Sequence, residues 1–328
     1  MIEPKSPQSQ QLAHISGKKL EKGTGRTRIW NHLALLMWMG GIHVNFFVAG
    51  LILTNLRSTW AITLLAVWIA LVFIPARSDG PVGQIVAKFI CKYAPKYFPI
   101  TVVFEDEGHL NSDGCYVIAA EPHSVLPVGI IVLTPQSGFL PLTKIRALAS
   151  TAVFWTPIIR HIWTWLGLVP VSRRHFSKLL EEGYSCILVP GGVQECLYME
   201  PDREVVYLKN RFGFVKVAIQ AGAAVVPCFC FGQTNTYRWW KPRGKWYNQM
   251  SRKLGFTPLV FWGRFGGPVP FPKPMYFVVG KPINVTKNPS PTNEEIAVLH
   301  GQYIRAVEEL FEKHKAAAGF KDTSLYVY

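Results

Sequence analysis

Two polar loops each follow an apolar run that is rich in strand-forming residues. The loops are Glu121–Ser124 (EPHS) and Pro190–Glu195 (PGGVQE). If the two runs are parallel strands of one sheet, their carboxyl ends meet at one edge, so His123 and Glu195 can lie close together. A histidine is suited to removing a proton from an alcohol near neutral pH. The pattern therefore predicts His123 as a general base, with Glu195 either orienting it or lining the acceptor site.

Other groups in and near these loops could bind substrate. Gly191 and Gly192 lack side chains, so their N–H groups could approach a ligand or a developing oxyanion closely. The adjacent Arg173 and Arg174 are suited to phosphate groups, and Arg211 opens a predicted helix. No metal site is predicted. The predicted substrate-binding residues are Glu121, Pro122, Ser124, Arg173, Arg174, Gly191, Gly192, Gln194 and Arg211.

The elements that must position these residues alternate between strands and helices. Such alternation predicts an α/β domain with a mixed, largely parallel sheet flanked by helices. A capping box at Thr292–Glu295 precedes an amphipathic final helix. The predicted strands are Tyr116–Ala120, Leu168–Val171, Tyr184–Val189 and Ala224–Phe231, and the predicted helical stretches are Ile145–Leu168, Phe176–Glu182 and Phe212–Gln220.

Two apolar stretches precede this domain. Leu33–Leu53 has 21 residues with only His43 and Asn45 polar, long enough to span a bilayer, whereas Trp60–Ile74 is short for a full span. We therefore predict a transmembrane or re-entrant helical hairpin over residues 29–76, with His43 and Asn45 packed inside it. Residues 1–28 are predicted to form a basic, disordered cytosolic tail, and residues 77–328 a cytosol-facing domain that ends in the amphipathic helix.

Composition limits the functional classes. The chain has 328 residues, is 49% hydrophobic and has a net charge of +15, so most of it cannot be disordered. Six cysteines without C-x-x-C pairs exclude a disulfide scaffold and a zinc ribbon. Residues 201–280 carry twelve Lys/Arg and two Asp/Glu among many aromatic residues. This favours ligand phosphates or an anionic membrane surface, and no nucleic-acid-binding module is recognisable.

Several long segments resemble the type 2 diacylglycerol O-acyltransferase family, and the match covers nearly everything after about Asn31. The EPHS loop looks like the plant and algal form, whereas animal members typically carry His-Pro-His-Gly. The wider glycerolipid acyltransferase superfamily pairs its histidine with an aspartate five positions later. Here that position is Val128, so Glu195 is the candidate substitute. The matching segments are Lys96–Pro99, Glu121–Ser124, Arg160–Leu168, Tyr184–Glu195, Arg211–Ala218, Pro227–Gln233 and Val278–Ile283.

The resemblance implies a glycerolipid-acyltransferase-like fold and an acyl-CoA-dependent esterification of the sn-3 hydroxyl of 1,2-diacylglycerol. Fatty acyl-CoA is then a substrate, and no cofactor is expected. The expected partners are diacylglycerol, the endoplasmic reticulum membrane and the lipid-droplet surface, but no nucleic acid; homo-oligomer formation is left open.

Three alternatives remain at this point. Within the same class, the acceptor could be a monoacylglycerol or a fatty alcohol. A lipid hydrolase with Ser124 as nucleophile is a remote alternative, because the G-x-S-x-G motif is missing. A non-catalytic lipid-droplet protein would need the hairpin but would leave the polar loops without a role.

Overall fold

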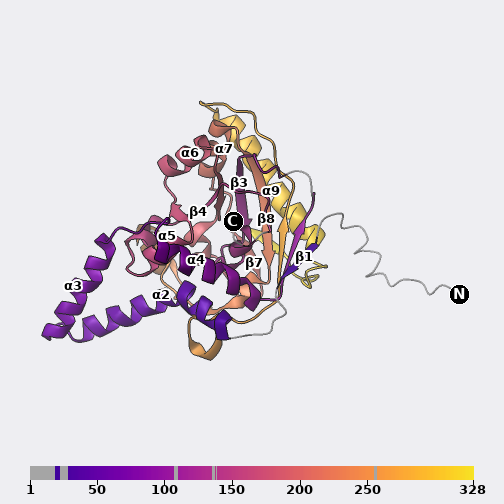
Figure 1. The fold of residues 1–328 in the computed structure, drawn as a ribbon. Helices are drawn as coiled ribbons and strands as arrows, with labels where there is room; N and C mark the ends of the chain where they lie inside the picture. The colour runs from indigo at the N-terminus through magenta and orange to yellow at the C-terminus, as the bar shows by residue number, and fades with distance from the viewer. Residues whose placement is uncertain (1–18, 23–28, 107–109, 135–136, 138, 255–256) are drawn as a thin grey trace.

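An eight-stranded sheet forms the centre of the computed structural model, which describes residues 19–22, 29–106, 110–134, 137, 139–254 and 257–328 (Figure 1). The strand order is β1-β2-β11-β8-β3-β6-β4-β5. The strands are β1 (Lys19–Lys22), β2 (Ile100–Phe104), β3 (Tyr116–Glu121), β4 (Ile145–Ala149), β5 (Leu168–Pro170), β6 (Ser185–Leu188), β8 (Ala224–Phe231) and β11 (Met275–Val279).

Five neighbouring strands of this sheet, β8, β3, β6, β4 and β5, run parallel. β11 runs antiparallel to β8 and parallel to β2, and β1 is antiparallel to β2. The last residues of the five parallel strands therefore lie along one edge, which we call the carboxyl edge. The predicted α/β class with a mixed, largely parallel sheet is confirmed.

Helices cover both faces of the sheet. Residues of α6 (Arg173–Glu181), α7 (Gly213–Ala221) and α9 (Asn293–His314) build the core on one face. Residues of α2 (Ile29–Thr54), α4 (Pro81–Tyr93) and the 3₁₀ helix η2 (Val128–Leu133) build the core on the other. The predicted capping box at the start of α9 is confirmed, because the Thr292 and Glu295 side chains bond each other's backbone N–H groups.

Burial on both faces explains the unbroken apolar runs of the central strands. In β3, Val117 and Ala119 face the α6–α7–α9 core, whereas Ile118 and Ala120 face the other core. A strand covered on both sides needs apolar residues at every position. The predicted strands at Tyr116–Ala120, Tyr184–Val189 and Ala224–Phe231 are therefore confirmed with small shifts of their ends.

The apolar stretch Ile145–Leu168 is not one helical segment, so this prediction was wrong. It contains β4, the 3₁₀ helix η4 (Thr151–Trp155) and the short helix α5 (Ile159–Trp165), and it ends at the first residue of β5. Apolar runs of strand length do not distinguish a buried strand from a helix by periodicity. Ile145–Ala149 forms a strand because it pairs with β6 on one side and with β5 on the other.

The predicted disordered tail also needs a correction at residues 19–22. These residues form β1, which pairs antiparallel with β2. The outer side of β2 offers unpaired N–H and C=O groups that a further strand can satisfy. The remaining tail residues, 1–18 and 23–28, lie outside the described residues.

The two apolar helices α2 and α3 (Thr59–Phe73) form a hairpin that projects from the body (Figure 1). Ile29–Thr54 is long and apolar enough to cross a membrane, and α3 is shorter. Asn45 packs inside the hairpin, as predicted, whereas His43 faces the domain, with its Nε2 3.2 Å from Phe261 O. The Asn45 side chain donates to Gly41 O (2.6 Å) and Pro157 O (2.8 Å) and accepts from Trp68 Nε1 (3.0 Å). Asn45 thus ties both hairpin helices to the segment before α5.

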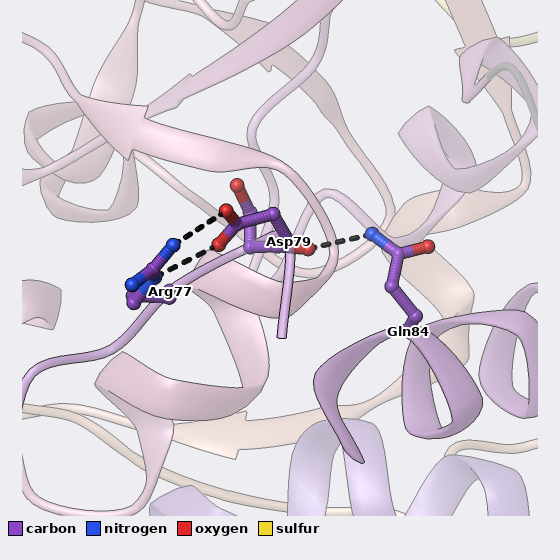
Figure 2. A network of polar contacts seen from close by, with 4 residues as sticks. Arg77, Asp79 and Gln84 are labelled. Carbon is purple, nitrogen blue, oxygen red and sulfur yellow. Dashed lines mark hydrogen bonds and ion pairs between the residues drawn. The ribbon is translucent and has the colours of Figure 1, made fainter. Parts of the chain in front are cut away.

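The carboxyl end of α3 is fixed by a side chain of the domain, and the linker that follows has its own polar contacts. Arg160 of α5 donates to Ile74 O at 2.6 Å and so satisfies a carbonyl group beyond the last turn. In the linker that follows, Arg77 binds Asp79 through two hydrogen bonds, and Gln84 Nε2 donates to Ser78 O (Figure 2). The Arg77–Asp79 pair is exposed, so it shapes the linker more than it stabilises the fold.

A long excursion, residues 232–274, leaves β8 and returns to β11 at the carboxyl edge. It contains the 3₁₀ helix η6 (Gln233–Thr236), the antiparallel pair β9 (Arg238–Trp240) and β10 (Val260–Trp262), and α8 (Lys245–Leu254). Near it, β7 (Glu204–Val206) pairs in parallel with β12 (Leu325–Val327).

Candidate active site

His123 lies in the loop that directly follows β3 at the carboxyl edge. Its Nδ1 is 2.9 Å from Ser124 O. Because a carbonyl oxygen can only accept, Nδ1 must carry the proton, which leaves the lone pair on Nε2. Burial and the charge of Arg211 lower the pKa of His123. The imidazole is therefore neutral at neutral pH, with a basic Nε2.

Glu195 lies on the 3₁₀ helix η5 (Gly192–Leu197) and is fully buried. Its Oε1 accepts from the backbone N–H groups of His123 (2.5 Å) and Ser124 (3.3 Å), and its Oε2 accepts from Tyr207 N (3.1 Å). The sheet brings the two predicted catalytic residues together, as expected. Glu195 holds the backbone of the His123 loop, however, and the imidazole itself is oriented by the Ser124 carbonyl.

Glu121, the last residue of β3, is also fully buried. Tyr303 of α9 donates to its Oε1 at 3.4 Å. Burial and the nearby charge of Glu195 raise the pKa of Glu121 well above its usual range. Burial also raises the pKa of Glu195, to about 7, in spite of its three N–H donors. We conclude that Glu121 is the protonated member of a carboxyl–carboxylate pair, which argues against its predicted contact with substrate.

The other residues of the EPHS loop are held by the domain. Pro122 O accepts from Gln233 Nε2 at 2.6 Å, and Gln233 Oε1 accepts from Gly129 N at 2.7 Å. The Ser124 hydroxyl donates to Leu126 O (3.2 Å) and is buried, so it is not a nucleophile activated by the imidazole. Sequence reasoning gave Gln233 no role. The signal was present, since Gln233 is a polar residue immediately after the buried strand β8.

Arg211 is bound to the second loop. Its Nη2 donates to Gly191 O (2.7 Å) and to Gln194 Oε1 (3.2 Å), while its Nε is buried without a hydrogen-bond partner among the described residues. The N–H of Gly192 already donates to Val189 O at 3.1 Å. The N–H of Gly192 is therefore not free for an oxyanion, whereas the oxyanion role expected of Gly191 stays a prediction.

Arg173 and Arg174 lie apart from the other predicted residues. They begin α6, directly after β5. The strand order places β5 three strands from β3, roughly 14 Å at the usual strand spacing. Both arginines are exposed, and Arg173 donates to Gln220 Oε1 at 3.2 Å. The structure does not bring them to the His123 loop.

Replacement of Gly191 with alanine is expected to cause a large loss of activity. A Cβ atom at this position would overlap the Glu195 carboxylate, although the backbone angles are ordinary. The carboxylate would have to move away from the N–H groups of the His123 loop. Rates and thermal unfolding of Gly191→Ala measure the effect. Gly213→Ala on α7 is the control, because its Cβ meets nothing within 4 Å; equal activity of both variants would contradict the expectation.

Comparison with known proteins shows the family of this chain. The family profile described as "Diacylglycerol acyltransferase" matches residues 52–328. The chain belongs to the diacylglycerol acyltransferase family. It is 34% identical to human 2-acylglycerol O-acyltransferase 3, over 68% of this chain and 70% of that protein. It is 30% identical to human diacylglycerol O-acyltransferase 2, over 89% and 81%, and 30% identical to mouse diacylglycerol O-acyltransferase 2-like protein 6, over 95% and 98%.

A solved structure with a partly similar fold is the 1-acyl-sn-glycerophosphate acyltransferase PlsC from Thermotoga maritima, with a TM-score of 0.43 and 18% identity over 86% of this chain and 97% of that chain. As a member of the diacylglycerol acyltransferase family, the protein is an acyltransferase of lipid metabolism. Its relatives and the long apolar helix α2 together indicate a membrane-associated enzyme. The predicted enzyme class and family are thus confirmed, whereas the roles of individual site residues stay predictions.

Proposed function

We propose that the protein transfers the acyl group of a fatty acyl-CoA to the sn-3 hydroxyl of 1,2-diacylglycerol. His123 Nε2 takes the hydroxyl proton while the alcohol oxygen attacks the thioester carbonyl carbon. The C–S bond then breaks, the CoA sulfur leaves with the bonding electrons, and the imidazolium returns the proton to it. The products are triacylglycerol and free CoA, and the enzyme is unchanged.

The observation that carries this proposal is the fixed imidazole tautomer. The Nδ1–H bond to Ser124 O leaves Nε2 as the proton acceptor, the task that a carboxylate performs for other catalytic histidines. Glu195 keeps the carbonyl in place by binding the N–H groups of His123 and Ser124. A base that is oriented through the main chain needs no aspartate at position 128.

Arg211 is the group that we assign to the developing oxyanion. Its charge already acts on His123, since it lowers the pKa of the imidazole. Its buried Nε has no hydrogen-bond partner in the part of the chain that the structure describes, and a fixed donor of this kind stabilises negative charge more strongly than water does. This replaces the oxyanion role expected of Gly192.

A monoacylglycerol acceptor is the second candidate, favoured by the 34% identity to a 2-acylglycerol O-acyltransferase. The purified full chain in detergent should be assayed with labelled oleoyl-CoA and, in parallel, 1,2-diacylglycerol, 2-monoacylglycerol and hexadecanol. We expect triacylglycerol to form fastest. Faster esterification of monoacylglycerol would favour the second candidate, and release of free fatty acid without any ester would contradict both.

We further propose that the domain faces the cytosol at the endoplasmic reticulum and reaches lipid droplets through the hairpin. The absence of acidic residues between Glu21 and Asp79 supports this orientation, because basic flanks are retained on the cytosolic side. A glycosylation sequon engineered between α2 and α3 tests it. Modification would show a lumenal turn, and no modification would favour a re-entrant hairpin.

A further inference from the structure

A cavity of about 990 Å³ opens at the carboxyl edge beside the His123 loop. Ser124 contributes to its wall, together with Glu204 of β7 and Thr234 of η6. Ligand pockets in proteins usually have volumes of about 300–1,000 Å³, so the cavity can hold a large ligand. Its contact with Ser124 places such a ligand next to the catalytic loop.

Most of the positive charge in the cavity comes from the excursion between β8 and β11. Residues 232–274 contain eight Lys/Arg and no Asp/Glu. Four of these basic residues line the cavity, and the ion pairs found among the described residues leave Arg238, Arg243 and Lys273 without an acidic partner. The four are Arg238, Lys241, Arg243 and Lys273.

Two of the three acidic residues of the wall are compensated. Glu200 is paired with Arg203 at 2.7 Å, and Glu204 accepts from Thr234 Oγ1 at 2.7 Å, whereas the third, Asp202, is exposed and is one charge against four basic residues of the excursion. Burial raises the pKa of Glu204 to about 7, so its charge is partial near neutral pH. The exposed Arg243 and Lys273 are thus available to an anion.

Aromatic side chains stand among these basic groups. The wall includes Trp239, Trp240 and Trp262, and Trp240 is 60% exposed. Lys241 lies over the Trp239 ring at 5.3 Å and donates to Cys196 O and Leu197 O, next to Glu195. Exposed indole faces beside unpaired cations are suited to stacking with a nucleobase whose phosphates meet the cations.

We infer that this cavity binds the phosphorylated adenosine portion of acyl-CoA, with Arg243 and Lys273 at its phosphates and Trp240 at its base. The inference rests on the proposed function, because it names where the donor of that reaction sits. The thioester arm would then pass Ser124 towards His123. The cavity takes over the phosphate-binding role predicted for Arg173 and Arg174, which lie at the far end of the sheet.

The test is a binding measurement that needs no turnover. The purified full chain is titrated with CoA and with dephospho-CoA, which lacks the 3′-phosphate. Arg243→Gln combined with Lys273→Gln is compared with Lys281→Gln combined with Lys287→Gln. The control pair removes two equally exposed charges after β11, at the opposite edge of the sheet. His123→Ala and the double variant Arg173→Gln, Arg174→Gln are titrated in parallel.

We expect the Arg243/Lys273 variant to raise the Kd for CoA at least tenfold and to bind CoA and dephospho-CoA with similar affinity. The control pair and His123→Ala should keep the parent Kd. An unchanged Kd in the Arg243/Lys273 variant, or a raised Kd in the Arg173/Arg174 variant alone, would overturn the assignment. Binding to this cavity by a protein that esterifies no acceptor would leave the site standing and refute the proposed function.

The phosphate groups of membrane lipids could also bind to the basic residues of this cavity. A second measurement distinguishes binding of lipid from binding of CoA. Flotation with vesicles of phosphatidylcholine alone, or of equal parts phosphatidylcholine and phosphatidylserine, is compared for the same variants. We expect the Arg243/Lys273 variant to float as the parent does. If it instead loses its preference for phosphatidylserine while its Kd for CoA is unchanged, the cavity is a membrane-contact surface and not a CoA site.

Discussion

Replacement of His123 with alanine is expected to lower the rate of acyl transfer by about 10²- to 10⁴-fold, the usual contribution of a positioned acid–base group. The variant loses Nε2, the only atom of this residue that can take the hydroxyl proton. It retains the His123 N–H bond to Glu195, because that bond involves the main chain. The loop should therefore keep its shape. Transfer of labelled acyl groups to diacylglycerol by the purified chain measures the loss.

A variant of a second histidine is the control that distinguishes loss of the general base from loss of folding. His175→Ala removes an exposed imidazole at the start of α6 and should have little effect on the rate. Membrane sedimentation should be the same for both variants. The pH profile adds a second readout: because the pKa of His123 is lowered, the acidic fall in rate should lie below pH 6.5. A His123→Ala variant with near-normal turnover would contradict the assignment.

Much of the fold was predictable because the central strands are buried on both faces. The runs that become β3, β6 and β8 are apolar at almost every position, a pattern that few surface elements share. Once these runs are parallel strands, their following loops must meet. This is why the pairing of His123 with Glu195 followed from the sequence, although the contact through the main chain did not.

The wrong expectation that Arg173 and Arg174 lie near the site shows that the order of the strands cannot be read from the local sequence. Arg173 and Arg174 follow a strand just as His123 does, so the local signal is the same. Their distance from the site is set by the strand order, in which β4 and β6 lie between β5 and β3. Strand order depends on long-range packing. The same holds for Tyr303, which reaches Glu121 from a helix 182 residues further along the chain.

The two buried carboxyl groups should respond in opposite ways to replacement by glutamine. In Glu195→Gln, the amide oxygen can still accept from His123 and Ser124, but the NH₂ group then faces the Tyr207 N–H. One buried donor is left unsatisfied, which costs about 1–3 kcal/mol. If this cost distorts the His123 loop, activity should fall by about 10- to 100-fold. The rate of acyl transfer, compared with the thermal midpoint, shows whether activity or folding is affected.

Glu121→Gln should retain most of the activity. The amide is neutral beside the Glu195 carboxylate, as the protonated Glu121 carboxyl group is, and its oxygen can still accept from Tyr303. Glu121→Ala is the matched comparison, because it removes the acceptor for Tyr303. Loss of activity in Glu121→Gln together with full activity in Glu195→Gln would show that the proton resides on Glu195.

The same pair makes stability depend on pH in a defined direction. Folding raises the pKa of Glu121, so above the usual glutamate pKa the folded chain holds a proton that the unfolded chain has lost. This one proton contributes a fall in stability of about 1.4 kcal/mol per pH unit as pH rises, whereas histidines such as His123, whose pKa burial lowers, act in the opposite sense below pH 6.5. Glu195 and Glu204, whose pKa values burial raises to about 7, add to the slope in the same sense as Glu121. Thermal unfolding of the parent and of Glu121→Gln between pH 5.5 and 7.5 should therefore show a shallower decline in the variant, which has no proton to lose at position 121. Equal slopes would mean that Glu121 is ionised in the folded protein, and the pair would then have to be held by another proton.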